Sequence, residues 1–106
     1  MVNEYGEALD RNGYAPSLIS DRVECVLCGC TTGKLDRHEI WGGALRQKSK
    51  NFGCWCYLCH EPCHLTEVHK NADTRRSLRR VCQPLAMERY GWTTEEFIKR
   101  FGRNYL

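Results

Sequence analysis

Cysteine and histidine are concentrated in one short stretch of this sequence. Residues 54 to 69, which read CWCYLCHEPCHLTEVH, contain four of the eight cysteines and three of the four histidines. Thiolate and imidazole are the usual protein ligands of zinc and of other transition metals. The stretch therefore indicates metal binding.

Two pairs of cysteines have the spacing of a structural zinc site. Two residues separate Cys25 from Cys28, and three separate Cys59 from Cys63. A short spacer of this kind lets both thiolates of a pair point at one tetrahedral ion. We therefore predict that Cys25, Cys28, Cys59 and Cys63 bind one structural Zn²⁺. Cys30 could replace Cys28 as a ligand, but a C-x-x-C pair is the commoner geometry.

The length and the start of the chain limit its class. A chain of 106 residues predicts one domain with a modest core. Residues 1 to 16 have neither the basic nor the apolar region of a signal peptide, and no window holds the ~18 apolar residues needed to cross a bilayer. We therefore expect a cytoplasmic protein with no membrane partner. Since the cytoplasm is reducing, zinc binding is favoured over disulfides for the cysteine pairs.

Two strands and a helix are expected around the metal-binding stretch. Residues 34 to 41 (KLDRHEIW) alternate, with Asp36 and His38 on one face, and predict a strand that ends at Gly42 and Gly43. Residues 42 to 53 are interpreted as a basic, polar connection to a second strand over residues 54 to 58. Pro62 suits the first turn of a helix over residues 62 to 70.

Helices are expected in the rest of the chain. A helix begins after Asn71, a break is predicted near Gln83 because proline interrupts helices, and a restart at Pro84 runs to Tyr90. Thr93 and Glu96 form a capping box for a last helix that ends near Phe101. The sequence thus predicts a loose N-terminal arm over residues 1–16 and one domain over residues 17–106. That domain has a core at about 34–70 and C-terminal helices at about 72–101.

The histidines of the predicted helix have an unusual spacing. His64 and His69 lie five positions apart, which places them about 140° apart around an ideal α-helix. Sharing one ion would need a local loosening of the helix or a long side-chain reach.

Three segments together carry a resemblance to a known family. They are Arg37-His38-Glu39-Ile40-Trp41-Gly42-Gly43, Leu58-Cys59-x-x-x-Cys63-His64 and Val68-His69-Lys70-Asn71, accompanied by the Cys25-x-x-Cys28 pair. This arrangement resembles the small α+β ββα-metal (His-Me finger) fold of HNH endonucleases, in the subgroup where two cysteine pairs hold a zinc. The remainder, with Phe101-Gly-Arg-Asn-Tyr-Leu106, is similar to small phage and prophage HNH proteins. The resemblance implies the cytoplasm of a bacterial host or a phage-infected cell.

The resemblance implies a metal-dependent DNA endonuclease that nicks or cuts its substrate. In the family a histidine near the end of the first strand activates a water, and one divalent ion binds the scissile phosphate and the departing 3′ oxygen. Carried over, His38 is the base, and His64 and His69 are ligands of a catalytic Mg²⁺, Mn²⁺ or other divalent ion. In an alternative register His38 is a ligand and Glu39 the base. The family's asparagine has no match at Gly53 or Cys54, and Asn51 is the nearest candidate.

Basic residues predict where DNA would bind. The net charge is only +3, so the distribution of charge matters more than the total. Arg46 and Lys48 of the 42–53 connection could contact phosphates, as could the densest basic cluster, Arg75, Arg76, Arg79 and Arg80; a solvated surface is the alternative for both. A zinc-stabilised nucleic-acid-binding module with a degenerate nuclease site is the second hypothesis for function. A homodimer and a phage packaging or replication partner are left open.

Overall fold

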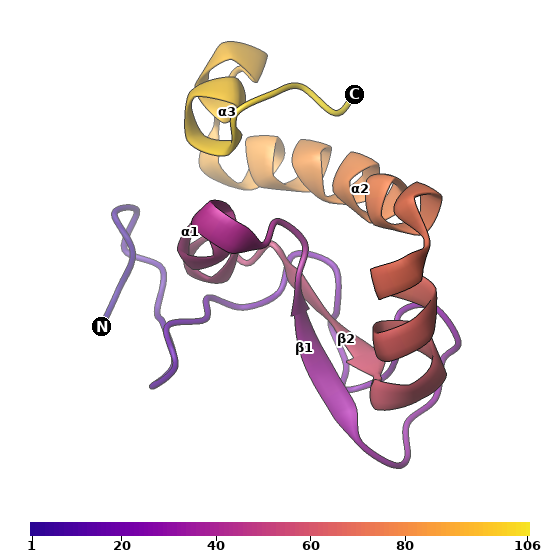
Figure 1. Ribbon diagram of the computed structural model, residues 1–106. Coiled ribbons are helices and arrows are strands. Elements are labelled where there is room, and N and C mark those ends of the chain that lie inside the picture. Colours follow the sequence, from indigo (N-terminus) through magenta and orange to yellow (C-terminus); the bar gives the residue numbers. More distant parts are fainter.

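Two antiparallel strands and a series of helices make up the computed structural model, which describes residues 1–106 (Figure 1). Strand β1 (Leu35–Glu39) pairs with β2 (Trp55–Cys59), with His38 opposite Cys56. The 3-10 turn η1 (Gly43–Leu45) and helix α1 (Arg46–Asn51) connect the strands. A π-helical segment, η2 (His60–Val68), leads to the helices α2 (Ala72–Tyr90) and α3 (Thr94–Phe101). The protein is therefore a small α+β fold, as predicted.

The core is formed between the sheet and the two C-terminal helices. Sixteen buried residues form one cluster, to which β2 contributes Cys56 and Leu58, α2 contributes Leu78, Cys82 and Ala86, and α3 contributes Phe97 and Phe101. Trp41, which follows β1, packs against Phe97 and Phe101 with ring centroids 5.5 and 4.7 Å away. Burial of these aromatic rings fixes the end of β1 against α3.

The connection over residues 42–53 differs from the prediction, because most of it is helical. Its sequence is polar, but Ser49 is fully buried and bonds to both backbone groups of Trp41: it accepts from the N–H at 3.0 Å and donates to the carbonyl at 2.8 Å. Phe52 is also buried at the end of α1. These two side chains dock the helix against the end of β1. The polar composition of the segment is typical of a solvated loop, so the sequence alone does not predict a docked helix.

The predicted break near Gln83 is wrong, since α2 runs unbroken through Pro84. Proline removes the hydrogen bond to the carbonyl four residues earlier, here that of Arg80. Pro84 and Arg80 are both exposed, so water can bind the free carbonyl. The opposite face holds Cys82 and Ala86, both fully buried, and this packing stabilises the continuous helix.

The predicted cap of α3 is confirmed, and α2 also has a side-chain cap. The Asn71 side chain accepts from the N–H groups of Asp73 and Thr74 at the start of α2. Thr93 caps α3 by accepting from the N–H of Glu96 at 3.1 Å, and Gly102 ends it in the left-handed conformation. None of the helices combines the length and apolar character that a membrane span requires.

The N-terminal residues 1–16 lack helices and strands apart from an isolated bridge between Val2 and Ala8, but they are docked rather than loose. Asn3 is buried and donates to the carbonyl of Asn51 at 2.8 Å. The indole N–H of Trp92 donates to the Tyr5 hydroxyl at 2.7 Å, and that of Trp55 donates to the Ala15 carbonyl at 2.7 Å. These contacts join the segment to the core, and a sequence without periodicity cannot predict them.

Candidate metal centre and histidine pocket

The four predicted zinc cysteines come together. Cys25 and Cys28 lie in the loop before β1, while Cys59 ends β2 and Cys63 lies in η2. Their sulfur atoms all lie within 4.8 Å of one another, and Cys28 Sγ is 3.8 Å from Cys59 Sγ. A tetrahedral ion with Zn–S distances of about 2.3 Å would hold its sulfurs about 3.8 Å apart. The arrangement therefore fits a structural zinc ion.

The electrostatics of the cysteine cluster also favour a cation. Burial alone would raise the pKa of the Cys25 thiol, but backbone N–H groups of Cys59, Cys28 and Leu27 lower it to about 6. Burial and the neighbouring thiols raise the pKa of Cys63. Negative charge on one sulfur is thus stabilised by the backbone, while negative charge on several requires a positive ion among them.

The remaining cysteines do not join the cluster. Cys30 directs its thiol to the Thr32 carbonyl at 3.1 Å. Cys54, Cys56 and Cys82 are fully buried in the core. Burial raises the pKa of Cys56 to about 12, which leaves this thiol protonated and unreactive.

The wide turns of η2 bring His64 and His69 together. A π-helix bonds each residue to one five positions along the chain, so a five-residue spacing places side chains on the same face. The ring centroids of His64 and His69 are 4.9 Å apart. The separation of about 140° expected for an ideal α-helix therefore does not apply here. His38 on β1 faces the same pair, with its ring centroid 5.4 Å from that of His64.

Asp36 is the site residue that the sequence interpretation missed. Its Oδ2 atom lies 2.9 Å from Nδ1 of His64 and 2.7 Å from Nδ1 of His60. A carboxylate that accepts from one ring nitrogen fixes the imidazole and leaves the other nitrogen free to bind a metal. Asp36 lies two positions before His38 on the same strand face, and this alternation is the signal that could have identified it.

The histidines line a basic pocket of about 470 Å³. Its wall contains His38, His64 and His69, together with Arg46, Arg75 and Arg79. Imidazoles that can accept protons or bind a cation thus lie beside guanidinium groups that can bind an anion. Among groups of three or more cysteine, histidine and acidic residues, only the four cysteines bring their ligand atoms all within 4.8 Å of one another.

The two candidate bases in the pocket, His38 and Glu39, have shifted pKa values. Burial, together with the nearby His64 ring, lowers the pKa of His38 to about 4, so its imidazole is neutral at pH 7. Burial alone would raise the pKa of Glu39, but Arg46, whose Nε donates to the carboxylate at 2.5 Å, lowers it below its ordinary value. Glu39 is therefore ionised and tied to an arginine.

Other predicted site residues lie away from the pocket. Asn51 ends α1, where its carbonyl accepts from Asn3, and it does not line the histidine pocket. Lys48 donates to the carbonyl of Arg100 in α3 at 2.8 Å. Arg76 and Arg80 line a second pocket, described below. The helix in the 42–53 connection explains the positions of Asn51 and Lys48, because α1 fixes them where a flexible loop could have reached the site.

Comparisons with protein-family models, with curated proteins and with solved structures give no match. Function therefore has to be inferred from the side chains and their geometry.

Proposed function

We propose that this protein is a metal-dependent DNA endonuclease of the HNH type, in which β1, β2 and η2 form a ββα-metal finger. The observation that carries the proposal is the convergence of His38 and the His64–His69 pair on one pocket whose wall includes Arg75 and Arg79. A proton acceptor, two metal-ligand side chains and two cations are what hydrolysis of a phosphodiester requires.

His38 acts as the general base. It takes a proton from a water molecule, and the water oxygen forms a bond to phosphorus while the bond from phosphorus to the 3′ oxygen breaks. The leaving oxygen then takes up a proton, so the products are a 5′ phosphate and a 3′ hydroxyl. With its pKa lowered to about 4 by burial and by the nearby His64 ring, His38 is neutral at pH 7 and can accept this proton.

His64 and His69 would hold the catalytic divalent ion, Mg²⁺, Mn²⁺ or another. The ion would supply positive charge that stabilises the scissile phosphate and the leaving oxygen. Asp36 fixes the His64 ring for this role, because Nδ1 of His64 is held at 2.9 Å from the carboxylate.

The geometry favours His38 over Glu39 as the base. The Glu39 carboxylate binds Arg46 and has a lowered pKa, so it is a weak proton acceptor at pH 7. The neutral His38 ring has no hydrogen-bonded partner that would compete for its nitrogens, whereas Asp36 binds both His60 and His64.

Plasmid cleavage tests the proposal. We expect the zinc-loaded protein to nick or cut plasmid DNA with added Mg²⁺ or Mn²⁺ and not with EDTA. The His38→Ala variant should lose roughly 10²-fold or more in rate, as expected when a general base is removed, while zinc content and DNA binding are retained. Wild-type activity in His38→Ala combined with an inactive Glu39→Gln would assign the base to Glu39 instead.

A second function is favoured by the position of Asn51, which lies outside the pocket and leaves His38 without the amide partner that the family resemblance implies. On this alternative the chain is a zinc-stabilised module that binds nucleic acid and no longer cleaves it. DNA binding without cleavage under any divalent ion would identify this function.

A further inference from the structure

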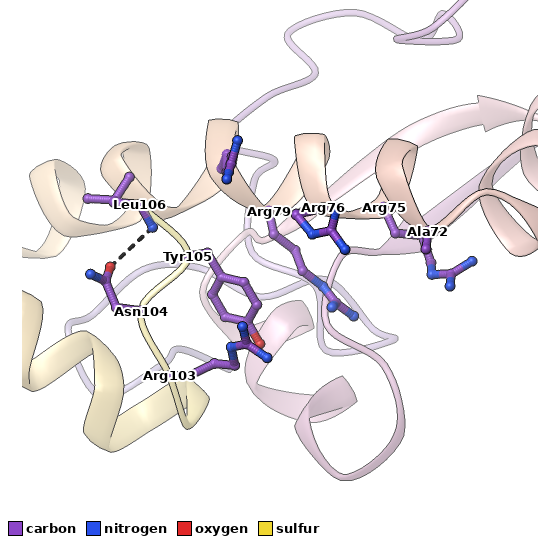
Figure 2. Close-up of a pocket in the computed structure, with 9 residues that line it drawn as sticks. Ala72, Arg75, Arg76, Arg79, Arg103, Asn104, Tyr105 and Leu106 are labelled. Atoms are coloured by element: carbon purple, nitrogen blue, oxygen red, sulfur yellow. Dashed lines mark hydrogen bonds between the residues drawn. The ribbon is translucent and has the colours of Figure 1, made fainter.

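A second basic pocket lies between α2 and the segment that follows α3 (Figure 2). After α3 the chain turns back and runs alongside α2 (Figure 1). The pocket has a volume of about 390 Å³, and five arginines line it together with Tyr105: Arg75, Arg76, Arg79, Arg80 and Arg103. The sequence cluster accounts for four of these arginines, whereas Arg103 joins them only in the folded chain.

The charge of this pocket is largely uncompensated. Arg76 pairs with the exposed Asp73 at 2.8 Å, and the other four arginines form no ion pair. Four arginines outside this pocket, Arg37, Arg46, Arg89 and Arg100, each pair with a carboxylate. Guanidinium groups gathered without acidic partners attract an anion, and their planar N–H groups suit phosphate oxygens.

Two of the arginines are held in place by the backbone. Arg75 Nη1 donates to the carbonyls of Val68 and His69, both at 2.9 Å, and Arg79 Nε donates to the carbonyl of Ile40 at 3.3 Å. Each guanidinium keeps further N–H groups for a ligand. These two side chains are therefore held in position before any anion binds, which lowers the entropy cost of binding.

A buried glutamine positions the C-terminal side of the pocket. Gln83 is fully buried, its Nε2 donates to Asn104 Oδ1 at 2.8 Å, and its Oε1 accepts from the backbone N–H of Tyr105 at 2.8 Å. The Tyr105 ring lies beside two guanidinium groups, with Arg79 and Arg103 carbons 5.5 and 5.2 Å from its centroid. These contacts place Arg79 and Arg103 beside the same ring.

The arginine pocket and the histidine pocket share part of their walls, since Arg75 and Arg79 line both. From this we infer that the arginine pocket is a second phosphate subsite, which binds a backbone phosphate of the same DNA strand whose scissile phosphate lies at His38. The inference rests on the proposed function, because it assigns the path of the substrate strand from one pocket to the next. Arg103 is the residue chosen to test it, because Arg103 lines the arginine pocket and not the histidine pocket.

Salt-dependent DNA binding by Arg103→Gln tests the subsite. Affinity for a short fluorescent duplex is measured over a range of salt concentrations, without added Mg²⁺ or Mn²⁺ so that no cleavage occurs. Loss of one phosphate contact should flatten the log–log salt slope by about one unit and weaken binding severalfold for any DNA sequence. Arg11→Gln is the matched control, since Arg11 is exposed, makes no ion pair and lies outside both pockets. Its salt slope should equal that of the wild type.

The outcomes distinguish failure of the phosphate subsite from failure of the proposed nuclease activity. If the wild type cleaves DNA and Arg103→Gln keeps the wild-type salt slope, the subsite is overturned and the nuclease stands. If the wild type never cleaves but the slope depends on Arg103, phosphate binding by the arginine pocket stands, whereas the nuclease and the path of the strand to His38 are overturned. Titration with inorganic phosphate, followed by the NMR signal of the Arg103 side chain, is the second arm. Saturable phosphate binding combined with an unchanged DNA slope would mean that the pocket serves a free anion, which overturns the assignment to a DNA strand.

Discussion

Asp36 presents one carboxylate oxygen to two imidazole rings, those of His60 and His64. Burial alone would raise the pKa of Asp36, but the hydrogen bonds from His60 and His64 lower it. The carboxylate is therefore ionised at neutral pH and accepts a hydrogen bond from the Nδ1–H group of His64. The other nitrogen of that ring is left with its lone pair, as a metal ligand requires.

Replacement of Asp36 should weaken the catalytic metal site. Asp36→Asn should raise the Mn²⁺ concentration needed for half-maximal cleavage by roughly 10- to 100-fold, the usual effect of removing such a partner. Zinc content, measured on the same sample, should stay unchanged. His60→Ala is the control, because it removes the other, more exposed partner of Asp36 and should leave the Mn²⁺ requirement close to that of the wild type. An Asp36→Asn variant with wild-type Mn²⁺ dependence would remove Asp36 from the site.

At the scale of elements, the turn between α1 and β2 fixes where the N-terminal segment lies beside β2. Gly53 has φ of 76°, and its carbonyl accepts from the N–H of Leu18 at 2.9 Å. A Cβ atom at this position would lie 2.3 Å from the backbone carbonyl oxygen of Pro16. No side chain fits there, which gives a physical reason why this position cannot carry the asparagine of the HNH resemblance.

Two glycine substitutions separate backbone strain from this close contact. Gly33 has φ of 77° with no atom near its Cβ position, so Gly33→Ala should cost only the left-handed strain, about 1–2 kcal/mol in the free energy of unfolding. Gly53→Ala adds the clash with the Pro16 backbone and should cost roughly 1–3 kcal/mol more. Denaturant unfolding of both variants measures the difference. Equal losses in the two would mean that the N-terminal segment moves aside freely.

Sequence reasoning succeeded for elements whose signals are local. Thr93 caps α3 through the side chain that the sequence indicates, α2 begins after Asn71 as predicted, and the alternation around His38 defines β1. Sequence reasoning failed where tertiary contacts determine the secondary structure. Buried Ser49 makes α1 a docked helix, and packing around Cys82 carries α2 through Pro84. The cysteine pairs were predictable because zinc imposes a short spacing, whereas Asp36 and Arg103 acquire their partners only on folding.

At the scale of the whole molecule, the cysteine cluster joins the loop before β1 to the corner where β2 enters η2. The same corner carries His64 and His69 towards His38. A metal ion among the four sulfurs would thus connect the N-terminal third of the chain to the histidine pocket.

Loss of zinc should therefore unfold the protein. Structural zinc sites contribute on the order of 10 kcal/mol in zinc-finger peptides, which is comparable to the whole stability of a small domain. We expect one zinc per chain by mass spectrometry, and expect Cys59→Ser to lose both the metal and the near-UV circular dichroism of the folded state. Cys30→Ser should keep both, since the Cys30 thiol lies outside the cluster. A folded, zinc-free Cys59→Ser protein would contradict the site.

The π-helical segment has a consequence for the lengths that this chain tolerates. In the π-helical segment η2, residues five positions apart lie on the same face, as residues four positions apart do in an α-helix. His64 and His69 are therefore adjacent although they are five positions apart. The segment therefore behaves as an α-helix that has absorbed one inserted residue. Removing exposed Thr66 should convert it to regular α-helix and keep the two imidazoles adjacent, because residues four positions apart lie on the same helix face. Natural variants of this protein that are one residue shorter between these histidines would thus retain the pair.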